Sequence, residues 1–233
     1  PVEDGDALLH HLQLIGLEHR EAAEVLGQLD AEGALDLLAG LVTDEFASTT
    51  AALISISDAE QGAVPTGTGI ADNVFNSIYR TVRTADDLLN GANALGAQFD
   101  AGTKAGLQVL AYTLKAEALG EAIQSYQKAP IKTFGETAPV YVPRAQALPY
   151  VRALLDSAAT ILAATPPSAF FNSSILTPGV SLTNVLNLYR ARYARMANDD
   201  ATALAAANLV ARSGTAALSV LTFPSPNVNP YAN

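Results

Sequence analysis

Apolar residues recur every three or four positions along most of the chain, as they do on one face of an α-helix. The longest stripe runs from Val74 to Leu95. Other segments with this spacing are residues 8–15, 34–42, 103–126, 147–162, 182–196 and an Ala-rich stretch that ends near Arg212. Ala, Leu, Glu and Gln fill these segments, and such residues lose little side-chain freedom in a helix. The pattern predicts an all-α fold.

Three stretches lose the helical spacing and collect Pro, Gly, Ser and Thr: residues 43–70, 127–143 and 165–180. Short connections elsewhere make consecutive helices antiparallel neighbours. We therefore expect stacked antiparallel helix pairs, similar to tetratricopeptide repeats, joined by long irregular loops. We also expect the three loops to gather on one side of the stack, where a ligand or partner would bind.

The chain as a whole is expected to form one domain over residues 1–233. Its helical core is predicted at about residues 30–212, and residues 213–233 form a tail that is rich in Pro and Asn and has no core pattern.

Charge and composition exclude several classes of partner and site. The net charge of −10, with no cluster of Lys or Arg, disfavours nucleic acid as a partner. The absence of cysteine excludes disulfides, thiolate metal ligands and a cysteine nucleophile. No run approaches the roughly 20 apolar residues that span a bilayer.

The order and content of the segments resemble the SusD/RagB family of nutrient-binding outer-membrane lipoproteins. Each matching segment is an ordinary amphipathic helix or loop, so the resemblance comes from their order. The segments are Ala39–Phe46 (AGLVTDEF), Asn76–Arg80 (NSIYR), Ala85–Leu89 (ADDLL), Val109–Ala118 (VLAYTLKAEA), Ala129–Ile131 (API), Ala147–Ala158 (ALPYVRALLDSA), Asn187–Arg195 (NLYRARYAR) and Asp199–Leu204 (DDATAL).

The resemblance implies a function at the surface of a bacterial outer membrane. Such a protein captures an oligosaccharide, or a peptide, and hands it to a TonB-dependent transporter of the SusC type. Members of the family are usually held by a lipidated N-terminal cysteine. Because this chain has none, the lipid anchor is expected upstream of Pro1.

The candidate ligand-binding residues are Phe170, Phe171 and Asn172 in one loop, with Tyr141 in the preceding loop as a companion. Aromatic rings stack on the apolar face of a sugar, and amides bind its hydroxyl groups. The alternative is that the phenylalanines fix their loop to the helical core. The absence of Trp weakens the sugar-binding interpretation. Tyrosines within the predicted helices, such as Tyr79 and Tyr189, are expected to pack in the core.

No arrangement of residues predicts catalysis, a metal or a cofactor. Asp86 and Asp87 are adjacent on a helix and do not face one another, so we expect both to be solvated. His11 and His19 are eight residues apart, which is too far for two ligands on adjacent helical turns, and His10 adds no such spacing. The sequence therefore predicts a binding protein rather than an enzyme.

Two other classes of function stay open. A tetratricopeptide-like adaptor would bind a protein partner and no small molecule. A helical enzyme would need a pocket with a carboxylate or histidine whose pKa is strongly shifted.

Overall fold

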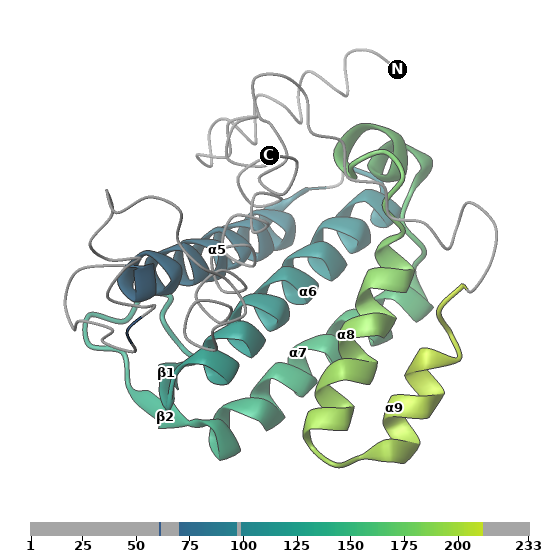
Figure 1. Cartoon of the computed structure of the whole chain (residues 1–233). Coiled ribbons are helices and arrows are strands. Elements are labelled where there is room, and N and C mark those ends of the chain that lie inside the picture. The colour runs from purple at the N-terminus through teal and green to yellow at the C-terminus, as the bar shows by residue number, and fades with distance from the viewer. Residues whose placement is uncertain (1–60, 62–69, 97–98, 212–233) are drawn as a thin grey trace.

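The computed structural model describes residues 61, 70–96 and 99–211, and these residues are mostly helical (Figure 1). The all-α prediction is therefore confirmed for this part of the chain, apart from one short hairpin. The elements in order are α5 (Ile70–Ala94), α6 (Ala101–Ser125), β1 (Lys128–Pro130), β2 (Tyr141–Pro143), α7 (Arg144–Ala164), the π-helical turn η2 (Phe171–Ile175), α8 (Leu182–Met196) and α9 (Asp200–Ala207).

The helix α6 lies at the centre of the described part, with α5 and α7 antiparallel to it (Figure 1). Near the start of α6, Gln108 donates a 2.7 Å hydrogen bond to Asn93, near the end of α5. At the other end of α6, Arg144 at the start of α7 donates to the carbonyl of Ile123 at 2.7 Å. The expected antiparallel neighbours are therefore present.

Burial on every side distinguishes α6 from the other helices. Every residue from Thr113 to Ile123 is buried, so this half of the helix presents no face to solvent. Many of these residues are Ala or Gly, which let neighbouring helices approach closely. A Cβ at Gly120 would collide with the phenol ring of Tyr193 on α8, so only glycine fits at this crossing.

Side-chain caps fix where three of the helices begin. Asp100 accepts a 2.8 Å hydrogen bond from the backbone N–H of Thr103 at the start of α6. Ser181 and Asp199 cap α8 and α9 in the same way. Each cap satisfies a backbone donor that the first turn of a helix leaves without a partner.

The segment predicted as the irregular loop 127–143 contains an antiparallel hairpin. Lys128 pairs with Pro143 and Pro130 pairs with Tyr141. The sequence gives little signal for strands of three residues that carry proline. A contact with α5 stabilises the hairpin, because the hydroxyl of Tyr79 donates a 3.0 Å hydrogen bond to the carbonyl of Pro130.

The prediction that the loops gather on one side is wrong for the two loops that can be placed. The hairpin lies at the C-terminal end of α6, and the 165–180 segment lies at its N-terminal end, where Ser168 and Thr103 share a 2.7 Å hydrogen bond. A helix of 25 residues is about 37 Å long. The third loop, 43–70, lies almost wholly outside the described residues, as do the early helical segments and the tail 213–233.

Among the described helices, α7 has the length and composition of a membrane span, with a mean hydropathy of 1.2. The core helix of a soluble protein passes the same test, so one such helix is weak evidence for a span. Here α7 makes ion pairs with its neighbours: Arg152 pairs with Asp199, and Asp156 pairs with Arg190. These contacts account for α7 as part of the helical layer.

Candidate functional site

Four aromatic side chains gather at the C-terminal end of α6, and we call this cluster the aromatic platform. Its members are Phe75 and Tyr79 on α5, Tyr126 directly after α6, and Tyr141 on β2. The centre of the Phe75 ring lies 4.5 Å from that of Tyr79, 5.2 Å from Tyr126 and 6.5 Å from Tyr141. Tyr126 meets Phe75 edge to face, whereas Tyr141 lies nearly parallel to it, at 10°.

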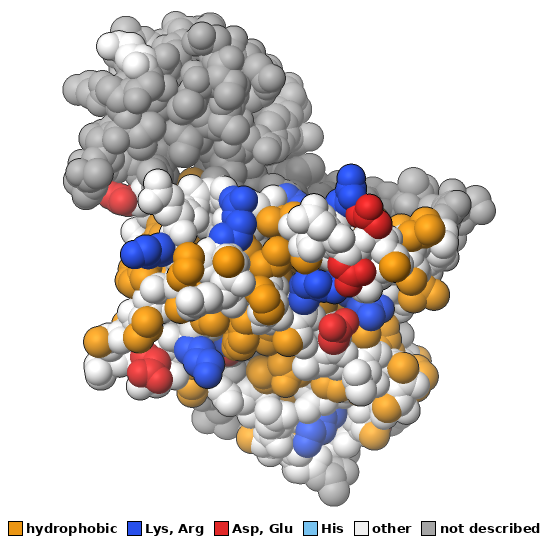
Figure 2. Space-filling view, turned by 90° about the horizontal axis from the view of Figure 1, so that it is seen from below, with side chains coloured by type: hydrophobic (Ala, Val, Ile, Leu, Met, Phe, Trp, Pro, Cys, Tyr) orange, Lys and Arg blue, Asp and Glu red, His pale blue; other side chains and the backbone are white. Residues whose placement is uncertain are grey.

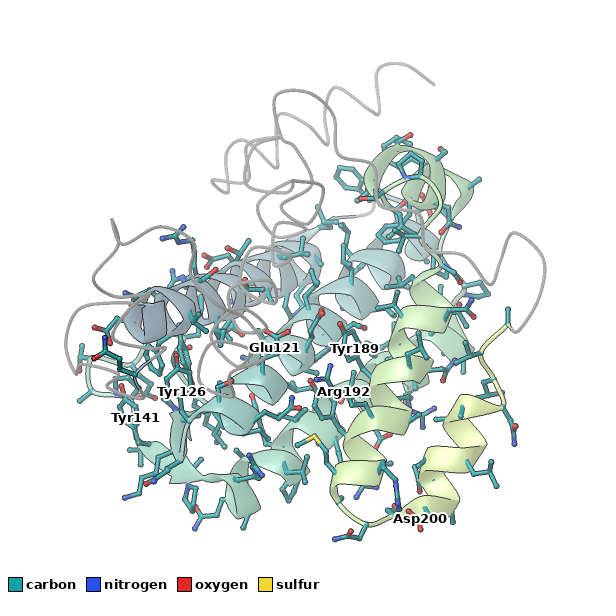
Figure 3. All side chains as sticks on the ribbon, viewed as in Figure 1. Glu121, Tyr126, Tyr141, Tyr189, Arg192 and Asp200 are labelled. Carbon is teal, nitrogen blue, oxygen red and sulfur yellow. The ribbon has the colours of Figure 1, made fainter. Side chains whose placement is uncertain are left out.

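The local structure explains why these rings meet. Phe75 and Tyr79 are four residues apart on α5, so they lie on one face of the helix. Tyr126 ends α6 beside them, and pairing with Pro130 holds Tyr141 against the same face. Figure 3 shows Tyr126 and Tyr141 at this end of the molecule. Tyr141 is 53% exposed, while the other three are half-buried.

Two tyrosines of the platform have raised pKa values. Burial raises the pKa of Tyr79, and the neighbouring Tyr141 and Tyr126 raise it further. Burial also raises the pKa of Tyr126 to about 12, with a further contribution from the carboxylate of Asp72 and an opposing backbone hydrogen bond from Phe75. Both hydroxyls therefore keep their protons at neutral pH, and Tyr79 donates a hydrogen bond to the carbonyl of Pro130.

Charged residues continue the same face of α5 beyond the rings. Arg83 follows Tyr79 by four residues and forms a 2.9 Å ion pair with Asp87. The Arg83 guanidinium also lies 4.7 Å from the centre of the Phe134 ring, which belongs to the connection between β1 and β2. The contact between Arg83 and Phe134 thus places the β1–β2 connection against α5. The ion pair of Arg83 with Asp87 lies one helical turn beyond the aromatic platform.

The aromatic platform thus combines a half-exposed ring, two further tyrosines and a neighbouring charged pair. Aromatic rings bind the apolar face of a pyranose, and hydroxyl and charged groups bind its polar edge. In residues 70–96 and 99–211, no three Asp, Glu or His side chains are placed to hold a metal ion. Figure 2 shows a face on which hydrophobic side chains are interspersed with basic and acidic ones, some of which lie next to each other.

The predicted ligand residues Phe170, Phe171 and Asn172 lie at the opposite end of α6. Phe171 is 0% exposed and packs on Gly106, where a Cβ would lie 2.5 Å from the ring. Phe170 is half-buried and Asn172 is exposed. For Phe171, packing against the core is therefore the interpretation that the geometry supports.

Tyr141 is not brought together with the Phe170–Asn172 segment. Phe171 packs on Gly106, whereas Tyr141 stacks on Phe75, which contacts Tyr126. The 20 helical residues between Gly106 and Tyr126 correspond to roughly 30 Å. Sequence reasoning also missed Phe75 and Tyr126, although the spacing of Phe75 and Tyr79 was a signal for two rings on one helical face.

The prediction that Asp86 and Asp87 are both solvated is wrong for Asp86. Its side chain is 7% exposed and forms a 2.5 Å ion pair with Lys115 on α6, whose side chain is 8% exposed. Asp87 is 35% exposed and pairs with Arg83. The sequence carries little signal for this pair, because Lys115 is one of several charged residues on α6, with Glu117 and Glu121 close to it.

Polar groups also join α6 to α8. Tyr189 donates a hydrogen bond to the buried carboxylate of Glu117, and Tyr193 donates to the backbone carbonyl of the same residue. Figure 3 shows Glu121 of α6 on the side of Tyr189 and Arg192. These contacts hold two helices together, and we assign them a structural role.

Comparisons with known proteins do not identify a family for this chain. No family model, no curated protein and no solved structure matches it.

Proposed function

We propose that this chain is a SusD/RagB-like nutrient-binding protein that captures an oligosaccharide on the aromatic platform. The single observation that carries this proposal is the half-exposed ring of Tyr141, stacked on Phe75, which also contacts Tyr79 and Tyr126. A peptide ligand is the alternative occupant of the same surface.

The rest of the proposal follows from the family resemblance. The antiparallel helices belong to a tetratricopeptide-like stack, and the captured ligand passes to a SusC-type TonB-dependent transporter. The protein acts at the outer membrane of a bacterium, held by a lipid anchor upstream of Pro1. Binding requires no catalytic residue, metal or cofactor.

A tetratricopeptide-like adaptor is the second candidate, and one observation favours it. Leu188 on α8, Leu204 on α9 and Leu209 just after α9 are large apolar side chains that are exposed to solvent. The adaptor would use these leucines as one apolar patch, because contiguous apolar patches mark sites of protein–protein contact. This surface is distinct from the aromatic platform, so the two candidates can be tested separately.

The experiment for the first candidate is calorimetric titration of the full chain with a panel of neutral and acidic oligosaccharides. We expect at least one to bind, and Tyr141→Ala to weaken that binding by about tenfold or more, because a stacked ring contributes on the order of 1–2 kcal/mol. Tyr141→Phe keeps the ring and should retain most of the affinity.

The matched control is Leu204→Ala, which removes an exposed side chain far from the platform. It should leave saccharide binding unchanged. If no saccharide binds, or if Leu204→Ala and Tyr141→Ala weaken binding equally, the proposed binding site is excluded. Loss of a peptide partner in Leu204→Ala alone would favour the adaptor.

A further inference from the structure

We propose that the aromatic platform selects acidic oligosaccharides, such as uronic acid polymers, over neutral ones. The inference rests on the proposed function and concerns the same site. Its structural basis is the exposed Lys128, on the strand that pairs with the strand of Tyr141, with a second exposed lysine, Lys132, in the connection between the two strands.

The hairpin register places Lys128 on the same side of the ladder as Tyr141. Lys128 pairs with Pro143, and Tyr141 pairs with Pro130, so the two pairs are separated by one residue on each strand. Side chains two positions apart on a strand point to the same face. Lys128 and Tyr141 are therefore diagonal neighbours, whose Cα atoms lie roughly 7–8 Å apart, within reach of a long side chain.

A sugar that stacks on Tyr141 and carries a carboxylate at its edge suits this arrangement of a ring and a neighbouring lysine. A pyranose ring lying on Tyr141 is a few ångströms wide, so an acid group at its edge can reach the ammonium group of Lys128. An ion-paired hydrogen bond of this kind is roughly twice as strong as a neutral one.

The two lysines are available for such a ligand. Within the described part of the chain, Lys128 and Lys132 have no ion pair and no side-chain hydrogen bond, whereas Arg83 beside them is paired with Asp87. They also lie in a chain of net charge −10. The acidic excess belongs to residues 1–60, where Arg20 is the only Lys or Arg, and not to the hairpin.

Two carboxylates near the platform limit where an acid group can lie. Asp72 is close to Tyr126, and Glu136 is exposed in the connection between β1 and β2. Both would repel an anion on their side of the rings. The acid group is therefore placed on the side of Tyr141 that faces Lys128, and the neutral edge of the sugar faces Tyr126.

The test compares acidic trisaccharides with their own neutral counterparts. The probes are trigalacturonate and trimannuronate, each against the same trisaccharide with its carboxyl groups reduced to alcohols, titrated into the full chain at low ionic strength. We expect each acid to bind about tenfold or more tightly than its reduced form, with a preference that shrinks as salt screens the charges.

Variants locate the preference on the hairpin. Lys128→Gln with Lys132→Gln should remove the preference for the acid and leave the affinity for the reduced form unchanged. Lys104→Gln, at the opposite end of α6, is the matched control and should keep the preference. Tyr141→Ala should weaken acid and reduced form alike.

Each outcome separates this inference from the proposed function. Equal affinity for acid and reduced form, or a preference that survives the double lysine substitution, overturns the inference while saccharide binding stands. The inference also fails alone if neither acid binds and neutral oligosaccharides do. If no saccharide of either kind binds, the proposed function itself fails.

Discussion

The two ends of α6 receive aromatic side chains in different ways. At the N-terminal end, Phe171 enters the space left by Gly106 and is wholly buried. At the C-terminal end, Phe75 of α5 contacts Tyr126, and the half-exposed ring of Tyr141 stacks on Phe75 from the solvent side. Phe171 is therefore part of the core, whereas Tyr141 is part of the surface.

The difference shows that the residue against which an aromatic side chain packs determines whether the ring is buried in the core or exposed at the surface. Both segments carry aromatic residues between prolines, and their sequences do not distinguish them. A missing side chain at Gly106 makes a site for a ring. A surface already occupied by aromatic rings offers Tyr141 a neighbour to stack on but no cavity to enter.

The largest expected effect is at the buried ring. Phe171→Ala should lower the free energy of unfolding by about 3–5 kcal/mol, because it leaves a cavity against α6. Denaturant unfolding followed by circular dichroism measures this, and saccharide binding by the folded fraction should not change. A loss below about 1 kcal/mol would mean that Phe171 does not close the core.

A substitution on α6 tests whether the missing side chain of Gly106 makes room for the Phe171 ring. Gly106→Ala should destabilise the protein by about 1–3 kcal/mol, because the new Cβ lies 2.5 Å from the Phe171 ring. The matched control is Gly96→Ala, where nothing lies within 4 Å of the added Cβ. Thermal unfolding of both variants should show a lower Tm for Gly106→Ala only. A similar loss in both would exclude crowding against Phe171 as the cause, and helix propensity cannot supply it at Gly106, because alanine is the better helix former.

A smaller effect is expected at the cap that begins α6. Asp100→Ala should cost about 1 kcal/mol at neutral pH through loss of the bond to Thr103. Hydrogen bonds from Thr103, first from its side chain, lower the pKa of Asp100. A lowered carboxyl pKa contributes stability above the ordinary value of about 3.9, and that stability is lost as the pH falls through the folded pKa.

The pH dependence of this cap gives the measurement. The difference in unfolding free energy between the wild type and Asp100→Ala should be constant from pH 7 to about 5 and shrink below about pH 4. Asp100→Asn, which keeps a cap without a titrating group, serves as the control. A difference that stays the same at low pH would exclude the ionised carboxylate as its cause.

The smallest effect on stability is expected at the exposed ring. Tyr141→Ala should change the free energy of unfolding by less than about 1 kcal/mol, because about half of the residue is already in water. Together with the expected loss of saccharide affinity, this separates a binding role from a packing role. A loss as large as that of Phe171→Ala would show that both rings serve the core and would remove the contrast between the two ends.

The helices could be predicted from the sequence because their signal is local. The stripe from Val74 to Leu95 and the prolines after Ala164 place α5 and the end of α7 without knowledge of any partner. The hairpin and the aromatic platform could not be predicted, since Tyr141 meets Phe75 only through a contact 66 residues away in the chain. The same limit applies to Asp86, whose burial depends on Lys115, 29 residues later.

The buried ion pair between Asp86 and Lys115 constrains how α5 and α6 can change over time. Replacing either residue alone leaves a charge without a counter-ion inside the helix interface, which costs roughly 3–5 kcal/mol. Replacing both by apolar residues of similar volume is close to neutral. A change from the ion pair to an apolar pair by single substitutions must therefore pass through a destabilised protein. We expect the residues at these two positions to change together. The pair also fixes the alignment of the helices, because a shift by one turn would separate the two charges by about 5.4 Å.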